Sequence, residues 1–271
     1  MQILFGRSKW DMPELTTREF IVHARNAGFD AVEMHLPSQH ESPGEIAGLC
    51  TEHSVTLVAM VYTTGTTPAE HTRSLEEQLQ SSFRARPALV NAHTGRDLFS
   101  LEENLAIFRR AIALSGEAGI PVVHETHRGR PTFSALSTRL ILEALPDLRL
   151  NADFSHWCCV HESLLQDFPD HLSLAIDHAD YIHGRVGYAE GPQITDPRSL
   201  EWHNETETHI EWWSSILNTH RQRGTARFII TPEFGPPPYM SVLPFTRQPV
   251  SSVDEINTYM MSLLRERFAH Y

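Results

Sequence analysis

Short apolar runs alternate with amphipathic stretches along the whole chain, at intervals of about 30 residues. The runs are rich in β-branched and aliphatic residues, which is typical of buried strands, and they cover residues 2–6, 31–36, 55–62, 89–94, 121–126, 148–154, 179–184 and 228–234. Between the runs, apolar residues recur at helical spacing, as at Leu101, Leu105 and Phe108. The predicted helices cover residues 15–27, 43–53, 68–82, 101–118, 133–144, 161–175, 200–222 and 252–268.

Eight strands that are each followed by a helix predict a parallel sheet, because parallel neighbours need a crossover connection. Eight such units close into a (β/α)8 TIM barrel, and no linker or low-complexity segment divides residues 1–271. We therefore predict an α/β protein with one barrel domain. A doubly wound open sheet is the competing architecture. It would be expected to carry a glycine-rich turn after the first strand, where the sequence instead reads FGRSKWD.

The charge and the cysteines narrow the classes of partner and compartment. A formal net charge of −12 argues against nucleic acid as a partner, since phosphate binding depends on Lys and Arg. The three cysteines Cys50, Cys158 and Cys159 form a poor disulfide framework, which favours a reducing compartment. The chain begins without a signal-peptide pattern and contains no apolar run near the ~20 residues of a membrane span. We therefore expect a cytoplasmic protein with no membrane partner.

Polar side chains gather where the predicted strands end, and these ends share one face of a barrel. The residues concerned are Glu33, His35, Asn91, His93, Glu125, His127, Asn151, Asp153, His156, His183, Arg185 and Glu233. Carboxylates that converge at one mouth repel each other, and a divalent cation relieves that repulsion. Glu125, Asp153, His183 and Glu233 offer three oxygen ligands and one nitrogen ligand, a set suited to Mn, Mg, Co or Zn. The alternative is a barrel mouth that is merely polar.

At these residues the sequence resembles the xylose isomerase-like TIM barrel superfamily, in particular its sugar phosphate isomerase/epimerase group. The matching stretches are GFDAVEMHL, VVHETH, NADFSHW, YIHGRVG and TPEFG, which follow one another in the order of the family's strands. The resemblance implies that Glu125, Asp153, His183 and Glu233 bind one divalent metal ion. It also implies that His156 contacts the substrate or a metal-bound water, and that Arg185 lies at the substrate.

The activity implied is a metal-dependent isomerase or epimerase of carbohydrate metabolism, with a sugar or a sugar-like polyol or keto compound as substrate. The metal, manganese for example, would stabilise an enediolate after a proton is removed beside a carbonyl. Glu125 and Glu233 would act as the catalytic base and acid, in an order that the sequence leaves open. A dehydratase acting on a keto-inositol or keto-sugar acid shares this first step and is the alternative. Homo-oligomer formation also stays open.

Five further residues are candidates for contact with the substrate: His93, His127, Glu33, Trp10 and Lys9, the only lysine of the chain. His93 could instead widen the metal shell or fill the barrel mouth, and aromatic packing is the default role of a tryptophan. Arg128 and Arg130 are expected in a solvated loop. The proline-rich segment after the last strand, EFGPPPYMSVLPF, is expected to shape one wall of the pocket.

Two other functions are weighed against the isomerase. Apurinic endonucleases resemble this group but add a D-x-H pair after the seventh strand, and here Asp196 is followed by Arg198 in place of that histidine. The missing histidine and the negative charge both argue against the endonuclease. The other function is a non-catalytic sugar-binding barrel, against which the intact set of four ligands argues.

Overall fold

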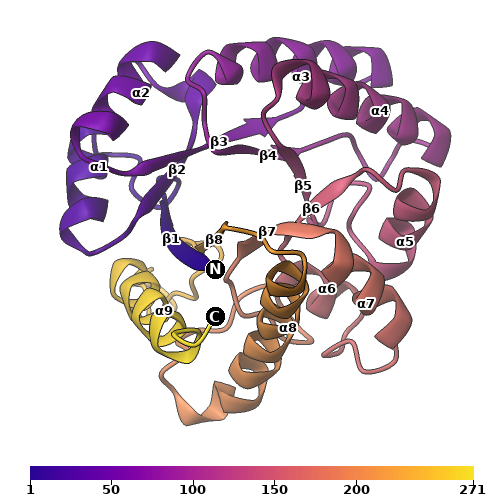
Figure 1. Cartoon of the computed structure of the whole chain (residues 1–271). Helices are drawn as coiled ribbons and strands as arrows, with labels where there is room; N and C mark the ends of the chain where they lie inside the picture. The colour runs from indigo at the N-terminus through magenta and orange to yellow at the C-terminus, as the bar shows by residue number, and fades with distance from the viewer.

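Eight parallel strands close into a barrel in the computed structural model, which describes residues 1–271 (Figure 1). The strands are β1 (Gln2–Ser8), β2 (Ala31–His35), β3 (Thr56–Tyr62), β4 (Leu89–His93), β5 (Val122–Glu125), β6 (Arg149–Ala152), β7 (Ala179–His183) and β8 (Arg227–Thr231). Each strand pairs with the next, and β8 pairs with β1. The predicted TIM barrel is therefore confirmed, and the open sheet is excluded.

Helices surround the barrel and connect its strands (Figure 1). They are α1 (Thr17–Asn26), α2 (Pro43–Glu52), α3 (Pro68–Phe83), α4 (Leu101–Ala118), α5 (Ala135–Ala144), α6 (Ser155–Val160), α7 (Pro169–His178), α8 (His203–Gln222) and α9 (Val253–Arg267), with short 3-10 turns η1 (Leu36–Ser38) and η2 (Leu200–Trp202). Capping boxes begin α1 to α4, where Ser or Thr accepts a hydrogen bond from the backbone of a glutamate three residues on. Gly119 ends α4 in the left-handed conformation, at φ 64°.

The predicted helix over residues 161–175 is wrong in its first half. The helix in this region, α7, begins at Pro169, whose missing N–H and fixed φ suit the first helical position. The preceding segment is irregular, with positive φ at Glu162 and Leu165. A six-residue helix, α6, lies earlier and begins two residues after the predicted ligand Asp153, and it is too short to produce a helical pattern of its own.

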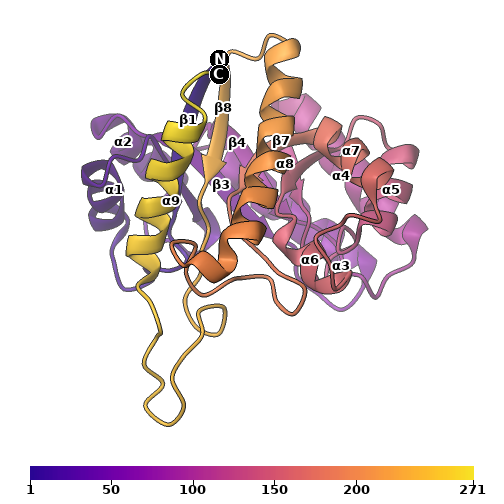
Figure 2. The same cartoon turned by 90° about the horizontal axis from the view of Figure 1, so that it is seen from below.

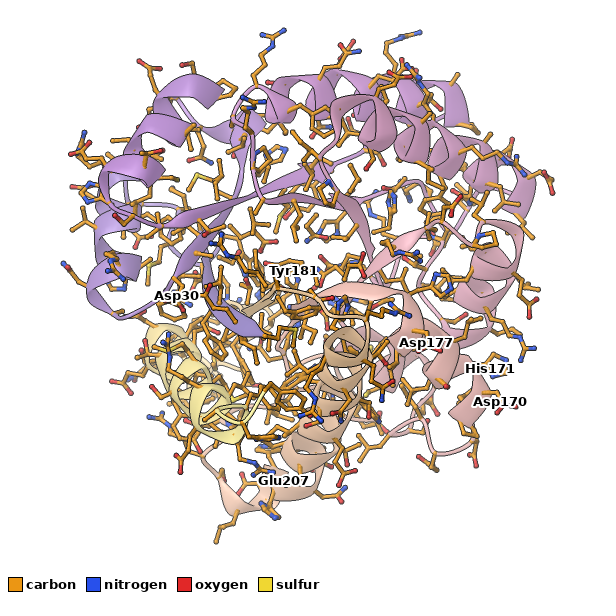
Figure 3. The ribbon with its side chains drawn as sticks, in the orientation of Figure 1. Asp30, Asp170, His171, Asp177, Tyr181 and Glu207 are labelled. Carbon is orange, nitrogen blue, oxygen red and sulfur yellow. The ribbon has the colours of Figure 1, made fainter.

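The interior of the barrel is apolar only at the amino ends of the strands. A cluster separate from the main core closes that end and consists of Leu4, Ala31, Val58, Leu89, Val123, Tyr181 and Ile229. Figure 3 shows Tyr181 near the centre of the ring, whereas Asp170 and Glu207 lie on the outer helical layer. Gly6 leaves space for Thr231, which accepts a hydrogen bond from the Tyr181 hydroxyl at 2.5 Å; a Cβ at Gly6 would overlap the Thr231 side chain. Above this layer the inward side chains become polar, which creates the site.

The two ends of the barrel differ in what projects from them. The amino group of Met1 donates to the carbonyl of Tyr271 at 2.9 Å, so both termini lie at the amino ends of the strands (Figure 2). The segment between β8 and α9 extends well beyond the opposite end. None of the helices combines the length and the apolar character that a membrane span needs.

Candidate metal centre

The four predicted ligands meet at the carboxyl ends of the strands. Glu125 and His183 end β5 and β7, and Asp153 and Glu233 follow β6 and β8 by one and two residues. One side-chain ligand atom from each residue lies within 4.8 Å of the others. All four side chains are buried, and Glu233, the most exposed of them, is only 5% exposed. The alternation of side chains along four strands therefore brings three carboxylates and one imidazole to a single point.

His183 occupies the middle of this group. Its Nδ1 lies 2.8 Å from Glu233 Oε2 and 3.3 Å from Glu125 Oε2, and its Nε2 lies 3.0 Å from Glu33 Oε1. Burial alone would lower the pKa of His183, but the charges of Glu233, Glu33 and Glu125 together raise the pKa well above its ordinary value. The carboxylates thus favour a positive charge at the centre of the cluster. A divalent cation could supply this charge in place of the proton on His183.

The two glutamates of the cluster lie in unequal surroundings. Glu125 Oε2 accepts hydrogen bonds from the Asn91 amide at 2.9 Å and from the Asn151 amide at 3.3 Å. Burial raises the pKa of Glu125, but the imidazoles of His93 and His183 outweigh that effect and hold the pKa well below its usual value. Burial raises the pKa of Glu233 above its usual value, although His183 and Arg185 oppose the change. Two carboxylates with opposite shifts are typical of an acid–base pair.

Asp153 is held by two hydrogen bonds from Ser155 and by an ion pair with Arg185. Ser155 donates to Asp153 Oδ1 through both its hydroxyl and its backbone N–H, and the Arg185 guanidinium binds Asp153 Oδ2. Arg185 also lies 3.2 Å from Glu233 Oε2, and its guanidinium is 3.1 Å from His156 Nε2. Burial raises the pKa of Asp153, and Arg185 limits the rise. Arg185 therefore bridges two of the acidic groups and orients both.

The atoms at the centre of the cluster fit a metal ion. His183 Nδ1 and Glu233 Oε2 are buried, and their partners are charged groups of the site itself: each other at 2.8 Å, Glu125 for Nδ1 and Arg185 for Oε2. The other nitrogen of His183 contacts Glu33, which is the arrangement that fixes the ring of a metal-binding histidine. Three carboxylates and one imidazole suit a hard or borderline divalent cation. The cluster could therefore hold one such ion.

A small pocket of about 250 Å3 opens over the cluster. Its walls are formed by Trp10, Tyr62, His93, Glu125, His127, Arg130, Arg185, Glu233 and Tyr239. Trp10 packs edge-on against Tyr239, with ring centroids 5.3 Å apart. Trp10 reaches this position because Gly235 has no side chain; a Cβ there would overlap the indole ring. The volume lies just below the range of about 300–1,000 Å3 usual for drug-sized ligands, and so suits a smaller molecule.

The residues predicted to contact the substrate lie in three different places. His93, His127, Arg185 and Trp10 line the pocket over the cluster, together with both glutamates. Lys9 lines a neighbouring pocket of about 620 Å3, which shares Trp10 and Tyr62 with the first. Glu33 and His156 are fully buried and line neither pocket; Glu33 supports His183, and His156 packs behind Arg185.

Three residues of the pocket wall were not among the predicted contacts. Tyr62 ends β3 and stacks on His93 with ring centroids 4.4 Å apart, and its place at a strand end could have identified it. Tyr239 comes from the proline-rich segment that was expected to form a wall. The expectation of a solvated loop is wrong for Arg130, which is half-buried and donates to the carbonyls of Thr63 and Gly95 at 3.2 and 2.9 Å.

No protein-family model matches the chain, and no curated protein sequence matches it. Solved structures do match. A D-allulose 3-epimerase from Methylomonas sp., in complex with D-allulose, is 15% identical with a TM-score of 0.64, and the match covers 98% of each chain. A xylose isomerase domain containing protein from Salmonella typhimurium is 13% identical with a TM-score of 0.65, over 96% of each chain.

An endonuclease IV from Thermus thermophilus matches to a similar extent, with 13% identity, a TM-score of 0.62, and coverage of 99% of this chain and 100% of the other. Proteins of different activities therefore match equally well, and at these identities the likeness concerns the fold. The chain has the fold of the xylose isomerase-like TIM barrels.

Proposed function

We propose that the protein is a divalent-metal-dependent isomerase or epimerase that acts on a small sugar or a sugar-like keto compound. The observation that carries the proposal is that Glu125 and Glu233 are the only carboxylates in the wall of the small pocket, and both belong to the buried cluster of four. A reaction that moves a proton between carbons, or from one face of a carbon to the other, needs two such groups on one cavity.

Glu125, Asp153, His183 and Glu233 would hold the metal ion, and when bound it would stabilise negative charge that develops on the substrate's oxygens. One of the two glutamates takes a proton from the carbon beside the carbonyl, and the other returns a proton. Arg185 fixes Glu233 and Asp153, and His93 and His127 offer imidazole groups to the hydroxyls of the substrate. Trp10 and Tyr239 pack against each other and form an aromatic part of the pocket wall.

A dehydratase is the second candidate because it begins with the same proton removal, and it differs only in that water leaves next.

An endonuclease is disfavoured by Asp196, which would have to contribute to a further metal site. Asp196 is bound instead by Arg198 at 2.7 Å and by the Ser251 hydroxyl at 2.7 Å, and it belongs to no group of potential metal ligands. The net charge of −12 also opposes the approach of a nucleic acid.

The test is to incubate the Mn2+-loaded protein with a panel of ketoses, inososes and keto acids in D2O. For at least one compound we expect deuterium at the carbon beside the carbonyl, detected by NMR and mass spectrometry, and loss of the exchange in Glu233→Gln and Glu125→Gln variants. Exchange with retained composition identifies an isomerase or epimerase, and loss of water identifies a dehydratase. The absence of exchange for every compound, with metal bound, would contradict the proposal and favour a binding protein.

A further inference from the structure

Lys9 is a buried cation without a partner inside the chain. Three lysine or arginine side chains are buried, and two of them, Arg7 and Arg185, each pair with two carboxylates. Lys9 is only 8% exposed, and its ammonium group makes neither an ion pair nor a hydrogen bond. Burial of an ammonium group is costly unless an opposite charge or hydrogen-bond acceptors stabilise it. The contacts of the chain itself therefore do not account for Lys9.

The backbone fixes Lys9 at the mouth of the barrel. Lys9 follows directly after β1, its N–H donates to the carbonyl of Glu33 at 2.9 Å, and its carbonyl accepts from Met12 at 3.0 Å. Its side chain lines the larger pocket, the one of about 620 Å3. The neighbouring residues line the same pocket, and Ser8 Oγ and Trp10 Nε1 are also buried without a hydrogen-bond partner. Three consecutive residues thus carry unused hydrogen-bond donors in the wall of one cavity.

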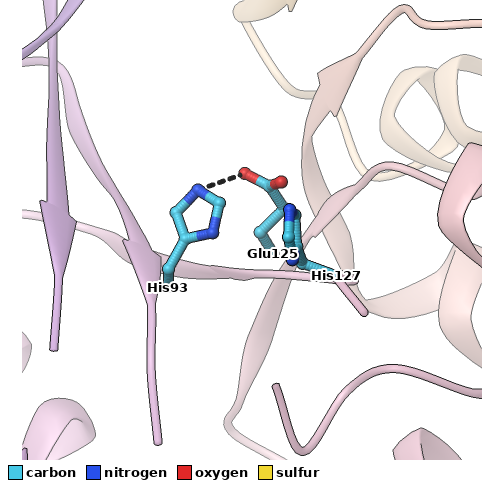
Figure 4. A group of neighbouring side chains, drawn as sticks. All are labelled: His93, Glu125 and His127. Carbon is cyan, nitrogen blue, oxygen red and sulfur yellow. Dashed lines mark ion pairs between the residues drawn. The ribbon is translucent and has the colours of Figure 1, made fainter. Parts of the chain in front are cut away.

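The larger pocket adjoins the small pocket over the metal cluster, because Trp10 and Tyr62 line both. The small pocket contains the reacting groups of the proposed function, with His93, Glu125 and His127 gathered in its wall (Figure 4). The larger pocket contains none of the four cluster residues. A molecule whose carbonyl end lies over the cluster can therefore extend past the two aromatic rings towards Lys9.

The wall of the larger pocket suits a ligand with one negative charge. Lys9 is its only lysine or arginine. Glu41 is its only carboxylate, makes no ion pair with Lys9, and accepts from the Thr17 hydroxyl at 2.6 Å. A phosphate carries about 1.5 to 2 negative charges at neutral pH and three acceptor oxygens, which one ammonium group in a wall that also holds a carboxylate does not match. A carboxylate carries a single charge, which one ammonium group balances.

We propose that Lys9 binds a carboxylate of the substrate, which makes the substrate a keto-sugar acid. The inference rests on the proposed function and names its substrate class: the carbonyl end would lie over the metal cluster and the acid end in the larger pocket. Lys9 would be a residue that determines specificity, because the ammonium group distinguishes an acid from the neutral sugar of the same shape.

The test compares D-fructose and D-tagatose with their terminal carboxylates, D-fructuronate and D-tagaturonate, and with their terminal phosphates. Isothermal titration calorimetry measures each dissociation constant for the Mn2+-loaded full-length protein. We expect each acid to bind about 10- to 100-fold more tightly than its neutral sugar, as one hydrogen bond between charged groups implies. Lys9→Met keeps the length of the side chain, removes its charge and should abolish this difference. Arg139→Met is the control and should keep it, because Arg139 forms an exposed ion pair on α5 and lines neither pocket.

A second measurement needs neither a variant nor catalytic activity. Lys9 is the only lysine, so reductive methylation with 13C-formaldehyde labels only Lys9 and the amino terminus. The methylated amine keeps its positive charge. In 13C-resolved NMR spectra, the Lys9 methyl signal should shift when an acid is added and should stay in place when the neutral sugar is added.

Three results would overturn the inference. They are acids that bind no more tightly than the neutral sugars, a difference that persists in Lys9→Met, and phosphates that bind more tightly than the acids. With any of them, exchange of a neutral sugar's proton in D2O would leave the proposed function in place. Binding of an acid that depends on Lys9, without exchange for any compound, would contradict the proposed function and leave the carboxylate site.

Discussion

Replacing Glu33 by Gln tests whether the Glu33 carboxylate, which contacts His183 Nε2, supports metal binding by the other ring nitrogen, Nδ1. Both oxygens of the Glu33 carboxylate lie near His183 Nε2, at 3.0 and 3.1 Å, and Nε2 has no other partner. Gln keeps the shape, and it keeps one oxygen that can accept from His183 and from the Asn91 amide 3.3 Å away. What it removes is the negative charge that favours a His183 ring with its hydrogen on Nε2.

The expected loss of metal affinity follows from the type of hydrogen bond. A bond to a charged partner contributes about 1.5–3 kcal/mol and a neutral one about 0.5–1.5 kcal/mol, so the substitution costs about 1–1.5 kcal/mol. This corresponds to a dissociation constant for Mn2+ about tenfold higher, at the lower end of the 10- to 100-fold range typical of such supporting residues.

The assay is competition for Mn2+ between the metal-free protein and a fluorescent chelator at neutral pH. Glu143→Gln is the control, since Glu143 forms an exposed ion pair with Arg139 on α5, far from the barrel mouth, and should leave the affinity unchanged. A Glu33→Gln variant whose affinity stays within twofold of the wild type would refute the reasoning, because His183 would then not depend on its buried partner.

Three further predictions concern the pocket wall, the pH dependence of stability and a helix start. Gly235→Ala should displace Trp10 and shift the tryptophan fluorescence to longer wavelength, whereas Gly116→Ala, whose added Cβ meets nothing within 4 Å, should not; an unchanged spectrum would show that Trp10 is not held there. Burial lowers the pKa of His209 from 6.5 to about 4. The unfolded chain therefore binds more protons than the folded chain as the pH falls. Between pH 6.5 and 4 the free energy of unfolding should fall by about 3 kcal/mol more in the wild type than in His209→Gln, as measured by urea titration. Ser100→Ala removes the cap of α4 and should cost about 1 kcal/mol in thermal or urea unfolding, and a change near zero would contradict the capping role.

The barrel could be predicted from the sequence because the same pattern of strand and helix repeats eight times along the chain. Each of the eight strands was expected close to its observed place, since an apolar run followed by an amphipathic stretch marks every unit. The residues at which individual helices begin and end were harder to predict. The helix expected at residue 161 begins at Pro169, because one proline at a first helical position determines the start more strongly than apolar spacing does. The one-turn-and-a-half helix α6 left no periodic pattern to read.

The candidate site could be predicted in part for a related reason. Parallel strands bring their carboxyl ends together, so Glu125, Asp153, His183 and Glu233 were expected to meet, and the structure brings them together. Contacts that depend on the conformation of the loops after the strands could not be predicted from the strand order. Arg130 reaches two carbonyls of the preceding loops, and Tyr239 reaches the pocket from a segment beyond β8.

The most direct test of the central claim is the position of a manganese ion in crystals of the protein grown or soaked with Mn2+, located by its anomalous scattering. The account predicts one strong peak within about 2.0–2.3 Å of Glu125, Asp153 and Glu233 oxygens and of His183 Nδ1. A manganese peak that lies elsewhere, or a cluster that stays without a peak at saturating Mn2+ while His183 keeps its contacts with the glutamates, would contradict it.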